Sequence, residues 1–121
     1  MKIAHIITRM IIGGAQENTF YTITGLIDKG YKVTLISGPS IGPEGSLETH
    51  IKQKKIPFKK IRTLIREINP FFDIIAFFKI GSFLRKEHFD IVHTHSAKAG
   101  IIGRLSSKIF SPCSITIHTI R

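Results

Sequence analysis

The chain has 121 residues, a length that favours one compact domain, and 42% of them are apolar, enough to form a core and to exclude a disordered polycation. Eighteen Lys and Arg residues against eight Asp and Glu residues give a formal net charge of +10. The single cysteine, Cys113, excludes a disulfide framework, and no apolar run approaches the roughly 18 residues of a membrane span. The first residues form too short an apolar run for a signal peptide, so we expect a soluble, cytoplasmic, strongly basic domain.

Short β-rich runs alternate with helical patterns along the chain. Strands are predicted over residues 2–7, 33–36, 58–61, 90–95 and 114–118. Four helices are predicted in the intervals between them, the second over about 46–55 and the third over 70–87. Gly30 stands where the C′ glycine of the first helix belongs, and Asn69 and Pro70 provide an N-cap and an N1 residue for the third.

This alternation predicts an α/β fold, a Rossmann-like open parallel sheet of five strands in the order 3-2-1-4-5 with helices on both faces. The first two helices are expected on one face and the last two on the other. No helix follows the fifth strand, so we expect exposed apolar area on the first face beside strands four and five. The residues that end strands one, four and five should converge on one crevice. These are Gly13, Gly14, His93, His95 and His118.

Two other open α/β folds of this length are excluded by their chemistry. A phosphoacceptor receiver needs acidic residues after strand one and an Asp after strand three, where this chain has Thr8-Arg9 and the basic segment from Lys60 to Arg62. A flavodoxin needs a hydroxyl- and Gly-rich phosphate loop after strand one, which Met10-Ile11-Ile12 does not provide.

Glycines and histidines supply the candidate chemistry. Gly13 and Gly14 fit an anion site at a helix entry, but equally a tight turn, and their spacing departs from the dinucleotide fingerprint. His93 and His95 share one face of a strand. We expect His95, at the strand end, to reach into the crevice in a polar or catalytic role, and His93 to lie deeper as a core histidine. Such a pair needs further His or carboxylate ligands to hold zinc or iron, and Asp90 lies at the wrong end of the strand, so no metal site is predicted.

The start of the fourth helix carries further candidates. Ser96 is an expected N-cap, and the same helix end can hold phosphate. Lys98 lies in the first turn, where the helix dipole disfavours a cation unless an anion is close. Gly100 and Gly103 indicate close packing of this helix on the sheet.

A basic segment precedes a Phe-rich helix. Its cations include Lys52, Lys54, Lys55, Lys59, Lys60 and Arg62. Basic residues beside apolar ones suit attachment to anionic lipid head groups, but a solvated basic face over a Phe-packed core fits equally well. No nucleic-acid motif accompanies the charge, so nucleic acid is not expected as a partner.

Five segments follow one another in a characteristic order. They are Met1–Ile7 with Gly13-Gly14-Ala15-Gln16, then Gly30–Ile36, Phe89–Ser96, Ala99–Arg104 and Ile117–Thr119. Together they resemble the N-terminal half of group 1-type, family 4 glycosyltransferases of the GT-B fold, over nearly the whole chain.

The resemblance implies retaining transfer of a sugar from a nucleotide-sugar donor, which is a substrate, without a cofactor and commonly without a metal. The N-terminal half of such enzymes binds the acceptor and the C-terminal half binds the donor. By position, His95 matches a histidine that contacts the reacting sugars. The substrate-binding positions implied in this way or expected to line the site are Gly13, Gly14, Ala15, Ser96, Lys98 and His118.

The second domain of the family is missing from the sequence, which stops at Arg121, directly after strand five. Residues 1–121 are therefore expected to form a single acceptor-side domain that is inactive alone and partners a donor-binding domain. Its acceptor would be a lipid-linked or polysaccharide glycan of cell-surface synthesis, reached at the inner face of the membrane. The alternative is a non-catalytic α/β module that binds a partner chain or an anionic membrane through its basic face.

Overall fold

The computed structural model describes residues 2–8, 14–38, 56–65, 69–95 and 97–119, with the backbone alone for 14–20, 97 and 119. Within them the strands are β1 (Lys2–Ile7), β2 (Lys32–Ser37), β3 (Phe58–Lys60), β4 (Ile91–His95) and β5 (Ile115–Thr119). The helices are α1 (Gly14–Asp28), α3 (Pro70–Glu87) and α4 (Ala97–Phe110). The helix predicted over about 46–55 lies outside the described residues.

The sheet confirms the predicted fold class and strand order. Its five strands run β3-β2-β1-β4-β5, and all four neighbouring pairs are parallel. The carboxyl ends of the strands therefore meet at one edge, and the strand order reverses between β1 and β4. This switch point is where open α/β sheets bind ligands.

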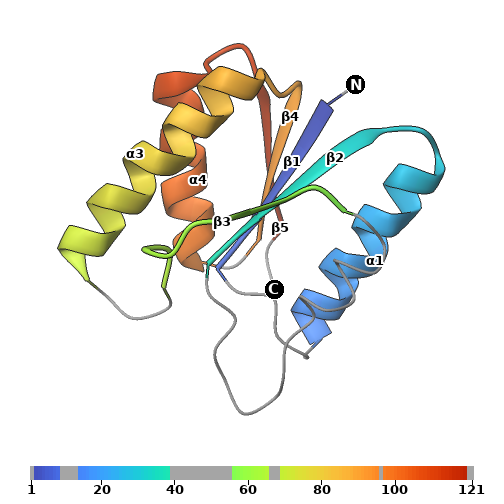
Figure 1. Cartoon of the computed structure of the whole chain (residues 1–121), viewed down its shortest axis with the longest axis horizontal. Helices are drawn as coiled ribbons and strands as arrows, with labels where there is room; N and C mark the ends of the chain where they lie inside the picture. The colour runs from blue at the N-terminus through green and yellow to red at the C-terminus, as the bar shows by residue number, and fades with distance from the viewer. Residues whose placement is uncertain (1, 9–13, 39–55, 66–68, 96, 120–121) are drawn as a thin grey trace.

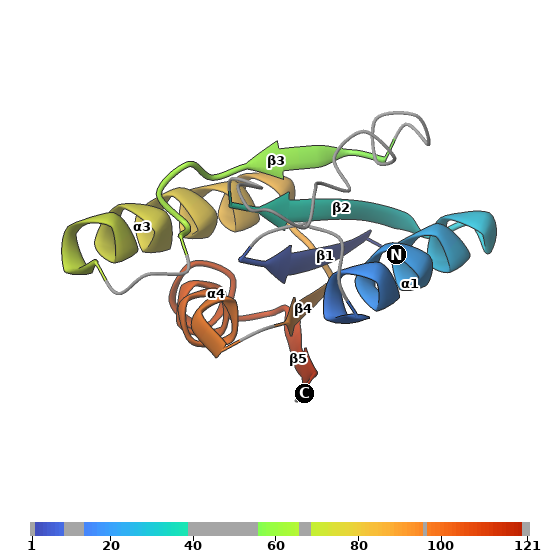
Figure 2. The same cartoon turned by 90° about the horizontal axis from the view of Figure 1, so that it is seen from below.

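The helices form a layer on each face of the sheet, with α1 on one side and α3 and α4 on the other (Figures 1 and 2). Successive strand residues point to opposite faces, so β1 contributes to both cores. Ala4 and Ile6 pack in the core below α3 and α4, whereas Ile3 and Ile7 pack with Ile23 of α1.

Local signals at the helix ends behave as predicted. The Asn69 side chain accepts a hydrogen bond from the Phe72 N–H at 3.2 Å, and Pro70 begins α3. Gly30 has a φ of 93°, a conformation that side-chain-bearing residues rarely adopt, and its N–H donates to the Ile27 carbonyl.

The last helix packs closely on the sheet, as Gly100 and Gly103 indicated. A Cβ at Gly100 would lie 2.4 Å from Cε1 of His118, and one at Gly103 would lie 2.7 Å from Cγ2 of Thr94. Hydrogen at these two positions lets α4 rest directly on β4 and β5.

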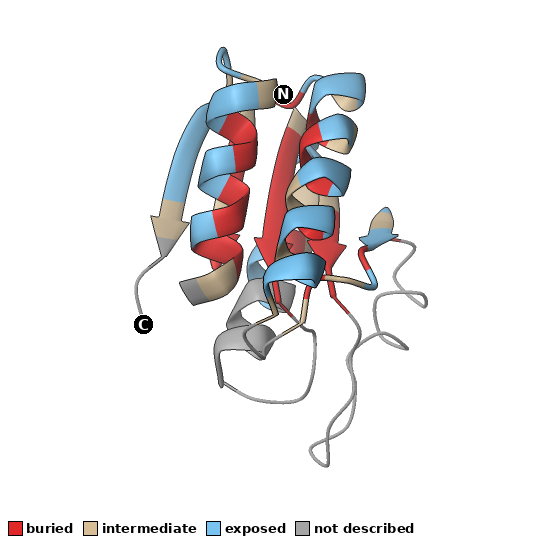
Figure 3. Cartoon of the chain, turned by 90° about the vertical axis from the view of Figure 1, so that its left-hand side faces the viewer, coloured by how far each residue is buried: buried red, intermediate tan, exposed pale blue. Residues whose placement is uncertain are grey.

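The α1 side of β5 is exposed, as predicted. Ile115 and Ile117 are 63% and 43% exposed, and β5 is largely pale blue beside the buried central strands (Figure 3). In the described part of the chain, α1 lies against β1 and β2, which leaves this end of the face open.

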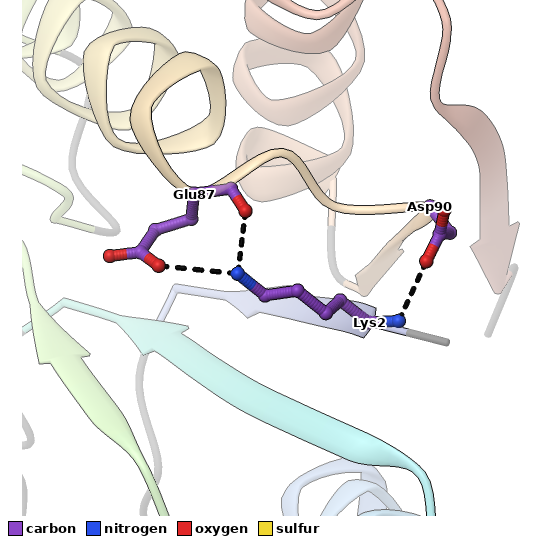
Figure 4. Close-up of polar contacts among 3 residues, drawn as sticks. All are labelled: Lys2, Glu87 and Asp90. Atoms are coloured by element: carbon purple, nitrogen blue, oxygen red, sulfur yellow. Dashed lines mark hydrogen bonds and ion pairs between the residues drawn. The ribbon is translucent and has the colours of Figure 1, made fainter.

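The amino-terminal edge of the sheet is held by polar contacts. The Lys2 backbone N–H donates to the Asp90 carboxylate at 2.8 Å, and its ammonium lies 3.3 Å from the Glu87 carboxylate (Figure 4). Asp90 thus stabilises the edge opposite to the switch point, as its place in the sequence predicted.

Candidate functional site

Three imidazoles from two neighbouring strands meet on the α1 side of the sheet; we call His5, His93 and His95 the histidine cluster. His5 of β1 is the register partner of His93 in β4, and His95 follows two residues later on the same face. The ring centroids lie 4.8 Å apart for His5 and His93, 4.3 Å for His93 and His95, and 5.2 Å for His5 and His95. Sequence reasoning missed His5, because its closeness to the other two depends on the pairing register of two strands whose partner residues are 88 positions apart in the sequence.

A hydrogen bond joins two members of the cluster. Nδ1 of His5 and Nε2 of His95 are 2.9 Å apart, and the two ring planes differ by 16°. Burial, together with smaller contributions from charge repulsion by His95 and His93, lowers the pKa of His5 to about 3. His5 is therefore neutral near pH 7, and one proton lies between the two hydrogen-bonded nitrogens.

The exposure of the two β4 histidines is the reverse of the prediction. His95 is 2% exposed, whereas His93, which was expected to lie deeper, is half-buried. The reason for the exposure of His93 is tertiary: its neighbour in β5 is Ile117, on the side of the sheet that α1 does not cover.

His118 lies on the opposite face from the histidine cluster. Its register partner is Thr94, not His93 or His95, and the Thr94 hydroxyl is hydrogen-bonded to Nδ1 of His118 at 2.7 Å. The ring also lies against Gly100 of α4. The expected single crevice therefore does not bring the His95 and His118 side chains together, because they point to different sides of the sheet.

Lys98 forms an ion pair with a carboxylate of the same chain. Its ammonium lies 2.9 Å from the Asp73 carboxylate, in the first turn of α3, and both side chains are partly buried. This pair offsets the unfavourable position of a cation near a helix N-terminus.

The remaining glycine-loop and helix-entry candidates are described only in part. Gly14 and Ala15 are the first two residues of α1, which begins at the carboxyl end of β1. Gly13 and Ser96 lie outside the described residues. The substrate roles of all four stay predictions.

A groove lies between β3 and α3, with a volume of roughly 460 Å³; we call it the basic groove. It is lined by Lys59, Lys60, Ile61, Phe78, Lys79, Ser82, Phe83 and Lys86. Four of these side chains are cationic and none is acidic, and Nζ of Lys59 lies 5.7 Å from the ring centroid of Phe83. Arg62 is exposed in the turn after β3, and Lys52, Lys54 and Lys55 lie outside the described residues.

Exposed apolar side chains continue from the basic groove along the outer surface of α3. Phe71 is 79% exposed and Phe78 is 56% exposed, and Ile74 is exposed between them. Phe78 also borders a second hollow, of roughly 350 Å³, shared with Ile102 and Leu105 of α4. None of the helices in the described ranges is long and apolar enough to cross a bilayer.

Three known proteins are similar to this chain in sequence or in fold. The chain is 30% identical, over 121 residues, to the UDP-Gal:alpha-D-GlcNAc-diphosphoundecaprenol alpha-1,3-galactosyltransferase of Escherichia coli. The match covers 99% of this chain and 30% of that relative. A solved glycosyltransferase from Rickettsia africae has 22% identity and a TM-score of 0.77, covering 98% of this chain and 29% of that one. MurG of Acinetobacter baumannii has 17% identity and a TM-score of 0.71, covering 98% of this chain and 34% of that one.

The two solved structures share the fold of this chain. The family relationship rests on a broader match, since the description Glycosyltransferase Family 4 fits residues 12–121. That range contains the switch-point edge of β4, the basic groove and every helix in the described part of the chain. The chain belongs to Glycosyltransferase Family 4.

Proposed function

We propose that this chain is the acceptor-side domain of a retaining glycosyltransferase. The complete enzyme would move a sugar from a nucleotide-sugar donor to a lipid-linked or polysaccharide acceptor of cell-surface glycan synthesis. In that reaction the bond between the anomeric carbon and the diphosphate breaks, and a bond to an acceptor hydroxyl forms with the same anomeric configuration. The hydroxyl proton leaves with the diphosphate or to solvent.

The observation that carries the acceptor assignment is the basic groove. Four lysines without an acidic neighbour in its lining suit a diphosphate, whose charge attracts ammonium groups in a partly enclosed site. The E. coli relative acts, by its name, on a diphosphoundecaprenol-linked sugar, a molecule with such a diphosphate beside a long lipid.

The apolar surface of α3 supports a lipid-linked acceptor. Phe78 lines the groove beside the lysines, and Phe71 and Ile74 are exposed further along α3. One helix surface thus offers contact to both an anionic head group and acyl or prenyl chains. This arrangement supports the domain's location at the inner face of the membrane as part of the proposal.

His95 is the residue we propose to contact the reacting sugars, since it ends β4 at the switch point. Its hydrogen bond to His5 holds the ring in one orientation. Because the ring is 2% exposed, a sugar reaches it only after a local rearrangement at the end of β4.

The donor side of the reaction needs a second domain. The chain spans 30% of its curated relative, and stabilisation of the leaving diphosphate by positioned charges is often the largest catalytic contribution. We therefore expect residues 1–121 to show no turnover with a panel of nucleotide-sugars, and activity to arise when a donor-binding polypeptide is supplied. Turnover by the pure monomer would contradict the assignment of donor binding to a second domain.

Acceptor binding is tested on residues 1–121 with a polyprenyl-diphosphate-linked N-acetylglucosamine in neutral nanodiscs. We expect binding that weakens at least tenfold in the triple variant K59Q/K79Q/K86Q. The control K29Q/K32Q/K108Q removes three exposed lysines outside the groove and should bind like the wild type.

Two results would count against the acceptor role. Equal loss of binding in both triple variants would mean that the acceptor is attracted by the overall positive charge and not by the basic groove. Binding to anionic vesicles that is as strong as binding to the lipid-linked sugar would favour the alternative, a membrane-binding module without an acceptor site.

A further inference from the structure

We propose that the histidine cluster binds one zinc ion, with His5, His93 and His95 as its three protein ligands. The site shares His95 with the proposed sugar contact, but zinc binding is measured without sugar transfer, so the two proposals can fail separately. His93 and His95 alone lack a third ligand, and the sheet supplies it from the neighbouring strand.

The cluster has the dimensions of a three-imidazole site. One nitrogen from each ring lies within 4.8 Å of the others. With Zn–N bonds of about 2.1 Å, three imidazoles around one zinc ion have ring centroids roughly 5 Å apart. The centroids here are 4.3, 4.8 and 5.2 Å apart, close to that spacing, and the tilted or stacked rings have to rotate to direct one nitrogen each at the ion.

An ordinary core role does not account for His5. Its Nδ1 takes part in the hydrogen bond to His95, but its Nε2 is buried and has no hydrogen-bond partner among the described residues. A fully enclosed imidazole with one nitrogen unsatisfied carries a desolvation cost that a purely structural histidine would avoid. Metal binding gives this costly arrangement a use.

Binding an ion requires the hydrogen bond between His5 and His95 to be exchanged for bonds to the metal. Zinc binds the lone pair of a neutral imidazole nitrogen, and the other ring nitrogen keeps the proton. On binding, the proton between Nδ1 of His5 and Nε2 of His95 moves to a ring nitrogen that faces away from the ion, so each imidazole stays neutral and no proton is released.

The site is both rigid and accessible. His5 and His93 are register partners on hydrogen-bonded parallel strands, which holds two of the ligands in place. His93 is half-buried beside the uncovered side of β5, which provides a route for the ion. Three protein ligands leave a fourth position for water or a small ligand, as in zinc sites that are not purely structural.

The test uses residues 1–121 stripped with a chelator and titrated with Zn²⁺ in a calorimeter and with Co²⁺ in a spectrophotometer. We expect one ion per chain, the visible absorption bands of tetrahedral Co²⁺, and a higher Tm with Zn²⁺. The variant H93A should bind at least 100-fold more weakly and should lose the Tm increase.

The matched control is H88N, which removes an exposed histidine that ends α3 with a φ of 54°, a conformation that Asn tolerates. It should bind zinc like the wild type. Should H93A fail to fold by circular dichroism, H93N keeps a polar side chain of similar reach and takes its place. Absence of binding, a stoichiometry other than one, or equal loss in H88N and the His93 variant would overturn the proposal.

Discussion

The two faces of the sheet are built from alternate residues of the same strands, yet they differ in how completely folding uses their polar groups. On the α3 and α4 face, Thr94 is paired with His118, and the Ser106 hydroxyl donates to the Phe77 carbonyl at 3.1 Å. On the α1 face, His5 keeps an unsatisfied nitrogen and Ile117 is exposed. The comparison indicates that the first face serves stability, whereas the second retains groups available for binding.

The largest expected effect contrasts core packing on the two faces. Leu84 of α3 is fully buried against the sheet, and L84A should lower the free energy of unfolding by about 2–5 kcal/mol through lost contacts and a cavity. I117A, on the open face, should change it by about 0.5 kcal/mol or less. Chemical denaturation of both variants measures the difference, and similar losses would mean that the open face is covered in solution.

The pH dependence of stability tests the enclosed histidine of the α1 face. The pKa of His5 is about 3 in the folded chain, against 6.5 ordinarily, so between these values the unfolded chain binds a proton that the folded chain does not. Stability is unaffected by His5 above pH 6.5 and falls as the pH drops toward 3, by about 1.4 kcal/mol per pH unit.

Denaturation of the wild type and of H5F, with chelator present, isolates this contribution. The curve of H5F against pH should be shallower between pH 6 and 4. Parallel curves would show that the His5 ring is hydrated in solution and not enclosed.

Paired glycine substitutions compare how tightly helices lie on each face. G103A should cost about 1–3 kcal/mol, because its Cβ would lie 2.7 Å from Thr94 and 3.1 Å from Ile6. G25A in α1 meets nothing within 4 Å and should stabilise by about 0.5–1 kcal/mol through helix propensity. Thermal unfolding distinguishes the two signs, and a stabilising G103A would contradict the close packing of α4.

The smallest effect concerns the ion pair that closes the α3 and α4 face. A double-mutant cycle of K98M and D73N should give a coupling energy of about 0.2–1 kcal/mol, since both side chains keep some exposure. A coupling near zero would return Lys98 to the position of a ligand-binding candidate.

Much of the architecture was predictable because it depends on short-range signals. Alternating strands and helices, the Asn69 N-cap, the Gly30 turn and the small residues Gly100 and Gly103 all act through neighbours in sequence or through one packing contact. The preference for right-handed crossovers then leaves few topologies for five parallel strands, so the strand order 3-2-1-4-5 followed.

The candidate sites depended on what the sequence alone does not contain. Which side of the sheet a residue faces, relative to a residue on another strand, is set by the pairing register; a shift of one residue would exchange the faces of His5 and of His118. The sequence by itself determined the fold class, the helix ends and the chemical types at the carboxyl edge, because these follow from local propensity and periodicity. Only the tertiary structure decided that His5 joins His93 and His95, that His118 does not, and that Lys98 pairs with Asp73, because those outcomes require strands and helices distant in sequence to lie side by side.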